Sequence, residues 1–272
     1  MGLKKVIPYP GMIITENVEF AEGEYDFQGK DGIIIGADNI VIEGNGAHLY
    51  NARERGFFGI GIYSNGKNGV NIRNLKVSGF DTGLYAKHGT GHIIEYCDFS
   101  DCFTDPAWGW DNHGFHGGIL FEHMNKCSIR NCKANNVWDA LNMRYSNDNQ
   151  VYNNDFSHTS DTGLKLWNSC GNQIYNNDFS YGIRIDPGEV HARDSAGVLI
   201  ESGSNNNIFK KNNITHGGDG LFIRVLNGWM STGNYFEEND CSYANKNAIE
   251  ARSDGNTYIS NKANYSRYGF CM

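Results

Sequence analysis

Short runs in which hydrophobic and polar residues alternate recur along most of the chain, each beginning at a small residue. The runs are GIGIY (59–63), GLYAK (83–87), GILFE (118–122), ALNMR (140–144), GLKLW (163–167), GVLIE (197–201), GLFIR (220–224) and AIEAR (248–252). Most begin about 22 to 24 residues after the run before, with longer steps to Gly118, Gly197 and Ala248. A period of two indicates β-strands, and the spacing of amphipathic helices is almost absent.

Two further β-like segments follow each run, as NQIYN and DFSY follow GLKLW. A short repeat with three strands and tight turns is typical of a parallel β-solenoid, in which the strands of successive coils stack. We therefore predict an all-β chain of about 9 to 10 coils, each with three short strands. The expected organisation is one domain over 1–272, with an N-terminal lead-in or cap over 1–30 and coils over 31–270.

The composition agrees with a chain that turns often. Gly is abundant at 34 residues, and the 13% of aromatic residues argue against disorder. A net charge of −8 without a basic tract argues against nucleic acid as a partner. The seven Cys, mostly inside strand-like segments, are interpreted as free buried thiols. No run of 18 apolar residues exists, so no membrane span is predicted.

The N-terminal MGLKKVIPYP contains no signal-peptide core. Localisation is therefore left open, with secretion or cell-surface attachment expected if a signal peptide has been trimmed.

Alternation assigns one set of first-strand residues to the core: Leu141, Met143, Leu164, Leu166, Val198, Ile200, Leu221 and Ile223. A second column is formed by Asn154, Asn177, Asn212 and Asn239, which occupy the same turn position in four coils. We expect these Asn to adopt the left-handed αL conformation and to hydrogen-bond along the column. In the coils before them the column reads Leu75, Cys97 and Cys132.

The repeats, together with the opening VIPYPGMIITENVEFAEGEYDF and NIVIEGNGAHL, resemble the right-handed parallel β-helix superfamily typified by pectate lyases and polygalacturonases. The chain is more closely similar to NosD-like proteins, which are built from short parallel β-helix repeats. The resemblance covers roughly residues 30 to 270. It implies a single-stranded right-handed parallel β-helix. It also implies that catalytic Asp residues would lie near the start of the first strand, although the fuller polygalacturonase motifs are absent.

An Asp recurs just ahead of the first strand, as Asp81, Asp139, Asp161, Asp194 and Asp219. Hydrogen bonding within the turn accounts for Asp81 and Asp219. Because coils stack about 4.8 Å apart, Asp139 and Asp161 are expected about 5 Å apart, and Asp139 and Asp194 about 10 Å apart. These separations bracket those of retaining and inverting glycoside hydrolases.

Two insertions distinguish one region of the repeat. SDCFTDPAWGWDNHGFHG (100–117) and YGIRIDPGEVHARDS (181–195) each precede a first strand and flank the two regular coils of Asp139 and Asp161. Long loops in a repeat protein usually mark the binding face. We expect a cleft about 10 to 15 Å wide between them, suitable for a sugar ring.

The candidate site residues lie in these loops and on the outward columns of the first strands. His suits proton transfer near neutral pH, and Trp offers a flat apolar face to a pyranose. The predicted catalytic residues are Asp139, Asp161, Asp194, His116 and Glu189. The predicted substrate-binding residues are Arg144, Lys165, Trp167, Trp110, Asp111, His113, His191, Arg193, Phe222 and Arg224. No cofactor is required, and Ca²⁺ held by Asp111, His113 and His116 is a weaker hypothesis.

Three functions remain open from the sequence. The leading hypothesis is a glycoside hydrolase that cleaves a poly- or oligosaccharide with paired carboxylates. The second is a polysaccharide lyase or uronate epimerase, with Lys165, Arg144 and Arg193 as cations near a uronate, although the acidic balance disfavours a polyanionic substrate and the DPH-type motif of alginate epimerases is absent. The third is a non-catalytic carbohydrate-binding or structural β-helix. Oligomeric state is not predicted.

Overall fold

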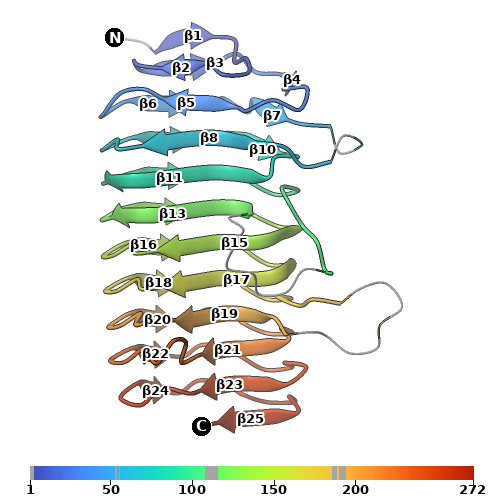
Figure 1. Ribbon diagram of the computed structural model, residues 1–272, viewed down its shortest axis with the longest axis vertical. Coiled ribbons are helices and arrows are strands. Elements are labelled where there is room, and N and C mark those ends of the chain that lie inside the picture. The colour runs from blue at the N-terminus through green and yellow to red at the C-terminus, as the bar shows by residue number, and fades with distance from the viewer. Residues whose placement is uncertain (1–2, 53, 55, 108–115, 186–188, 190–193) are drawn as a thin grey trace.

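A computed structural model describes residues 3–52, 54, 56–107, 116–185, 189 and 194–272. In these residues all regular secondary structure is β-strand, and the strands stack in successive coils along one long axis, from the N-terminus at one end to the C-terminus at the other (Figure 1). All the strand pairs within the sheets are parallel, so the predicted all-β parallel β-helix is confirmed.

Two sheets of eleven described strands each run the length of the molecule. The long-strand sheet consists of β2 (Ile13–Ile14), β5 (Ile33–Ile35), β8 (Ile60–Asn65), β11 (Thr82–Thr90), β13 (Gly117–Asn125), β15 (Val137–Arg144), β17 (Thr159–Trp167), β19 (Ala196–Glu201), β21 (Asp219–Ile223), β23 (Asn247–Ala251) and β25 (Tyr268–Cys271). The short-strand sheet consists of β1 (Lys4–Val6), β3 (Val18–Phe20), β6 (Val41–Glu43), β9 (Asn71–Arg73), β12 (Ile93–Glu95), β14 (Ser128–Arg130), β16 (Gln150–Tyr152), β18 (Gln173–Tyr175), β20 (Ile208–Lys210), β22 (Tyr235–Glu237) and β24 (Thr257–Ile259).

A third sheet contains β4 (Glu24–Asp26), β7 (His48–Tyr50) and β10 (Lys76–Ser78). It continues along later coils as single parallel bridges, from Lys76 through Asp98 to Lys262. The region expected as a lead-in is itself wound into this pattern, because β1 pairs with β3 and β2 pairs with β5.

The core assignment from alternation is confirmed, because all eight predicted first-strand residues are buried. The glycine that opens the run at 163 also has a steric reason. A Cβ on Gly163 would lie 2.8 Å from the carbonyl oxygen of Gly197 and 2.9 Å from Cβ of Phe179. The coil therefore turns too tightly around its core at this point for a side chain to fit.

The Asn column forms the expected ladder. The Asn177 amide donates to Oδ1 of Asn212 at 3.0 Å and to the Val151 carbonyl at 2.9 Å, while its own Oδ1 accepts from Asn154. The predicted αL conformation was wrong for this column, because positive φ belongs to the preceding residue, such as Asn153 or Asn176. The αL residue makes the turn, and the turn directs the side chain of the next residue into the interior. There the Asn amide hydrogen-bonds to backbone groups that have no backbone partner at the turn.

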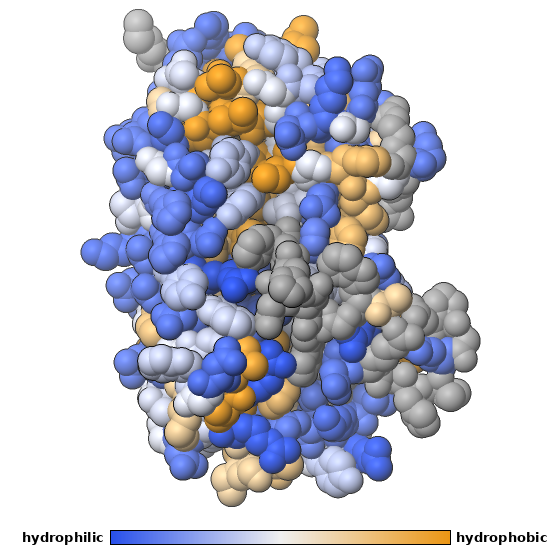
Figure 2. Space-filling view, in the orientation of Figure 1, coloured by the Kyte–Doolittle hydropathy of each residue, from blue (hydrophilic) through white to orange (hydrophobic). Residues whose placement is uncertain are grey.

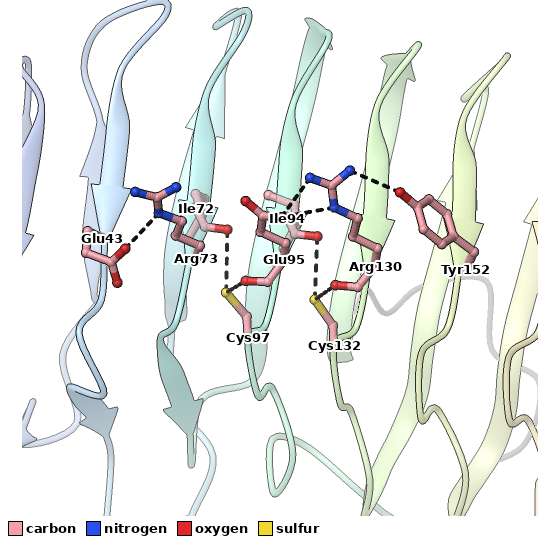
Figure 3. A network of polar contacts seen from close by, with 9 residues as sticks. All are labelled: Glu43, Ile72, Arg73, Ile94, Glu95, Cys97, Arg130, Cys132 and Tyr152. Atoms are coloured by element: carbon pink, nitrogen blue, oxygen red, sulfur yellow. Dashed lines mark hydrogen bonds and ion pairs between the residues drawn. The ribbon is translucent and has the colours of Figure 1, made fainter.

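A second interior ladder was not predicted. It runs through Asn149, Asn172, Asn207, Asn234 and Asn256, with amide-to-Oδ1 bonds of 3.0 to 3.1 Å. In the earlier coils of the first ladder, the one that contains Asn154 and Asn177, buried thiols replace Asn. Cys97 and Cys132 each donate to a carbonyl of the preceding coil at 3.6 Å, beside outward ion pairs such as Arg130 with Glu95 at 2.7 Å (Figure 3).

Candidate functional site

A β-bulge changes the pairing at the coils of Asp139 and Asp161. Val137 pairs with Thr159, but Asp139 pairs with Thr162, so that Ser160 and Asp161 on β17 together oppose Trp138 on β15. A bulge bends the strand and redirects its side chains, and bulges are frequent beside active sites. Asp161 therefore lies outside the regular column in which the repeat would have placed it.

Asp139 is buried, at 1% exposure, and both of its oxygens accept hydrogen bonds. Thr162 donates its hydroxyl to Oδ1 at 2.5 Å, and Asn142 donates its amide to Oδ2 at 2.9 Å. Thr162 comes from the next coil and Asn142 from the same strand. The carboxylate is thus fixed in position from two directions.

Asp161 is fully buried, and neither of its oxygens receives a hydrogen bond from the part of the chain that the structure describes. Burial raises the pKa of this carboxyl well above its usual range, and the negative charge of the nearby Asp139 raises it further. Lys165 and Arg184 act in the opposite direction. Burial and the charge of Asp139 together favour the protonated form of Asp161.

Two cations are buried with the carboxyl pair. Lys165 is 4% exposed, and its Nζ lies 5.8 Å from the ring centroid of Trp138. Arg184, in the second insertion, is 7% exposed. Formally the two positive charges match the two carboxylates. The Oδ1 of Asn142 is a further buried acceptor without a donor among the described residues.

His116 extends this cluster through its contact with Trp138. Its ring lies 6.2 Å from Trp138 and 4.6 Å from Phe103, measured between centroids. Nδ1 of His116 lies 2.7 Å from Oδ1 of Asp81. Asp81 was predicted to form a turn, so this pair was not predicted. The two residues are 35 positions apart, and only the coil stacking and the insertion between them bring them together.

A pocket of about 540 Å³ opens beside the bulge, between the two insertions. Thr104 and Pro106 come from the first insertion, and Tyr181, Ile183 and Ile185 come from the second. Asn136, His158, Thr159 and Ser160 complete the lining. The Thr159 hydroxyl is buried here without a partner among the described residues. The pocket reaches Ser160, the neighbour of Asp161 in the bulge.

The other predicted residues lie apart from the carboxyl pair or take packing roles. The Arg144 guanidinium lies 4.8 Å from the Trp167 ring centroid, at the far end of β15 and β17. Phe222 is buried against Ala196 and Leu199, so it is not an exposed platform for a sugar. Arg224 pairs with the buried Glu201.

The two acids predicted in or next to the second insertion are more accessible. Asp194 is exposed, at 67% of its side chain, and its carboxylate lies 3.8 Å from Nζ of Lys246. Glu189 is partly exposed. Asp194 therefore faces solvent and does not join the buried pair.

Five predicted substrate-binding residues lie outside the described residues: Trp110, Asp111, His113, His191 and Arg193. The calcium hypothesis rests partly on two of them. Within the described ranges no three His, Cys, Asp or Glu side chains gather as a metal site. No helix in those ranges is long and apolar enough to cross a membrane.

The coil architecture and the site on its long-strand sheet define a parallel β-helix protein. Residues 59–262 match the family described as "Right handed beta helix region", and the chain belongs to this family. The predicted resemblance to right-handed parallel β-helix proteins is thus confirmed. The coils of this family wind in the right-handed sense. No curated protein matches the chain in sequence.

Solved structures resemble the protein over nearly its whole length at low identity. The alginate lyase from Paenibacillus sp. str. FPU-7 has a TM-score of 0.67 and 16% identity, covering 98% of this chain and 93% of the lyase. The periplasmic alginate epimerase AlgG has a TM-score of 0.66 and 13% identity, covering 97% of this chain and 61% of the epimerase. The Streptococcus pneumoniae surface protein and adhesin PfbA has a TM-score of 0.57 and 11% identity, with 97% and 90% covered. At such identities the likeness shows the fold alone.

Proposed function

We propose that the protein is a carbohydrate-active enzyme in which Asp139 and Asp161 perform acid–base catalysis, acting as a glycoside hydrolase. The observation that carries this proposal is the set of buried acceptors left without donors: both oxygens of Asp161 and Oδ1 of Asn142. Each such group costs about 1–3 kcal/mol, and native proteins keep few of them. Substrate hydroxyl groups are donors that would satisfy them.

The two carboxyl groups have different surroundings, as an acid and its partner require. Asp161, with its raised pKa, is the group that retains a proton and donates it to the glycosidic oxygen. Asp139, held by Thr162 and Asn142, is the group that attacks the anomeric carbon. Since the two residues lie on adjacent coils, which stack about 4.8 Å apart, the pair is nearer to the about 5 Å separation of retaining enzymes than to the about 6.5–9.5 Å of inverting ones. We therefore propose retention of configuration.

A second candidate is a uronate lyase or epimerase. It is favoured by one observation, the burial of Lys165 and Arg184 in the same cluster. Two cations would neutralise a uronate carboxylate, and Lys165 would then be the base that removes the C5 proton. The lyase and epimerase named above are consistent with this alternative through their fold only.

The experiment is to incubate the protein with a panel of neutral and acidic polysaccharides and to follow three signals. New reducing ends without ultraviolet absorbance support the hydrolase. Absorbance from unsaturated uronates supports the lyase, and exchange of the C5 proton without cleavage supports the epimerase. Binding without any of these changes would leave a non-catalytic β-helix and would refute the proposal.

A further inference from the structure

A second pocket lies at the opposite end of the long strands, where β15, β17, β19 and β21 lead into their turns. Its volume is about 280 Å³, and its lining is Tyr145, Trp167, Asn168, Ser202, Asn227 and Trp229. Asp161 and Trp167 are six positions apart on β17, which corresponds to about 20 Å along a strand. The pocket is therefore distinct from the carboxyl pair.

Three aromatic rings in this lining are held in place by the protein. Tyr145 stacks on His123 at 4.8 Å with an interplanar angle of 7°, and Trp167 is covered on one side by Arg144. Trp229 is 65% exposed, although large aromatic side chains are usually buried. On the face drawn in Figure 2, hydrophobic residues gather towards the N-terminal end and in a small patch nearer the C-terminal end, both within a hydrophilic surround.

A hairpin presents Trp229. Leu226 and Trp229 form an antiparallel bridge, and the two residues between them, Asn227 and Gly228, have φ of 54° and 77°. Positive φ at both central residues is the signature of the tight Asn-Gly hairpin turn. The Trp229 ring lies against Gly203, where a Cβ would be 3.9 Å from Cε3. The ring is therefore placed by a turn built into the sequence.

The polar part of the lining includes an unused donor. Ser202 is 5% exposed, and its hydroxyl has no hydrogen-bond partner among the described residues. Two amide side chains, those of Asn168 and Asn227, line the same pocket. A buried hydroxyl without a partner points to a ligand that supplies one.

We propose that this pocket binds a single neutral pyranose unit of a saccharide chain, as a non-catalytic surface site. Aromatic rings pack on the apolar C–H face of a pyranose, and hydroxyl and amide groups hydrogen-bond to its edge. None of the six lining side chains is charged at neutral pH, which favours a neutral sugar over a uronate. The volume is at the low end of ligand pockets, about 300–1,000 Å³, as one ring requires. The inference rests on the proposed function only for the class of ligand.

The test is calorimetric titration of the full chain with cellohexaose, xylohexaose and mannohexaose, and with an alginate hexamer as the charged comparison. At least one neutral hexasaccharide is expected to bind with a Kd of about 1 mM or lower. Trp229→Ala should weaken that binding about tenfold or more, and Ser202→Ala should weaken it about threefold. Tyr265→Ala is the matched control, since Tyr265 is an 80% exposed aromatic residue outside the pocket.

The outcomes separate this inference from the proposed function. Wild-type affinity in Trp229→Ala, or absence of neutral-saccharide binding up to about 10 mM, overturns the pocket assignment. Tighter binding of the alginate hexamer than of every neutral chain overturns the class of ligand. Binding at this pocket is the part of the titration that Trp229→Ala removes, so saccharide bound at the carboxyl pair does not count towards it. If turnover is never found but binding depends on Trp229, the proposed function fails and the pocket stands.

Discussion

Asp139 stands opposite Thr162 on the next coil, and not opposite Asp161. Ser160 and Asp161 form a bulge at this point, which moves the second carboxyl out of the repeat's register but keeps it near enough for the charge of Asp139 to raise its pKa. A regular coil would have placed an Asp at the position of Thr162 instead. The hydroxyl that occupies this position donates to Asp139 at 2.5 Å. One extra residue thus produces both the carboxyl pair and the hydrogen bond that orients it.

The first prediction concerns the pH dependence of stability. Because the folded-state pKa of Asp161 is raised, the folded protein keeps a proton that the unfolded chain releases above about pH 4. The contribution of this carboxyl to the free energy of unfolding therefore decreases as the pH rises from about 4 towards its folded-state pKa. The difference between the melting temperature of Asp161→Asn and that of the wild type should therefore grow in favour of the variant as the pH rises over this range. Asp194→Asn, at an exposed position, is the control and should follow the wild type. A constant difference across the range would argue against a buried proton at Asp161.

The second prediction concerns the Asn ladder. Asn177→Ala removes four hydrogen bonds at a buried position, two donated and two accepted by the side chain. It should lower the free energy of unfolding by about 2–4 kcal/mol in denaturant titrations. Asn176→Gly changes the neighbouring exposed αL residue and should have little effect. Equal effects of the two variants would contradict the ladder's stabilising role.

The third prediction concerns the tight bend at Gly163. Ala at this position would meet backbone and side-chain atoms within 3 Å, so Gly163→Ala should destabilise the fold by about 1–3 kcal/mol. Gly269→Ala is the matched control, because the nearest atom to its Cβ would be 3.3 Å away and its φ is not positive. Thermal melts of the two variants decide the point. If only Gly269→Ala lowered the melting temperature, a steric requirement for glycine at position 163 would be contradicted.

The fourth prediction concerns the thiols. All seven Cys are free, but only Cys170 and Cys271 are partly exposed. Burial raises the pKa of Cys127 to about 11 and that of the fully buried Cys102 still further, so these thiols are poor nucleophiles. A thiol reagent should label two sites rapidly in the native protein and all seven in denaturant. Rapid native labelling of the core thiols, read by mass spectrometry, would show that the core opens readily.

The fold was predictable because each coil repeats the same local rules. Alternation placed Leu164 and Leu166 in the core, and the recurring small residue marked the bend. The Asn column was correctly recognised as a ladder, but the αL residue was misplaced by one position, since both neighbours at Asn176 and Asn177 are Asn. Two identical residue types left the sequence unable to say which one turns and which one points inward.

The site was predictable only in part, because it depends on departures from the repeat. The sequence pointed to Asp139, Asp161 and Lys165 and to the side on which the insertions lie. It did not reveal the bulge, since a one-residue shift leaves the hydrophobic pattern of Leu164 and Leu166 intact. It did not single out Arg184 among the polar residues of the second insertion, and it took Asp81 for a turn former, because their partners are set by the paths of long insertions, which periodicity does not constrain.

The most direct test of the central claim is the turnover of Asp161→Asn on the saccharide identified by the polysaccharide screen, compared with Asp219→Asn. Asp219 is also buried, has a raised pKa and lies on β21 of the same sheet, but it accepts hydrogen bonds from Asn247. The account predicts that Asp161→Asn lowers kcat/KM by about 10³-fold or more, while the Asp219→Asn variant stays within about tenfold of the wild type. Wild-type turnover in a correctly folded Asp161→Asn variant would contradict the account.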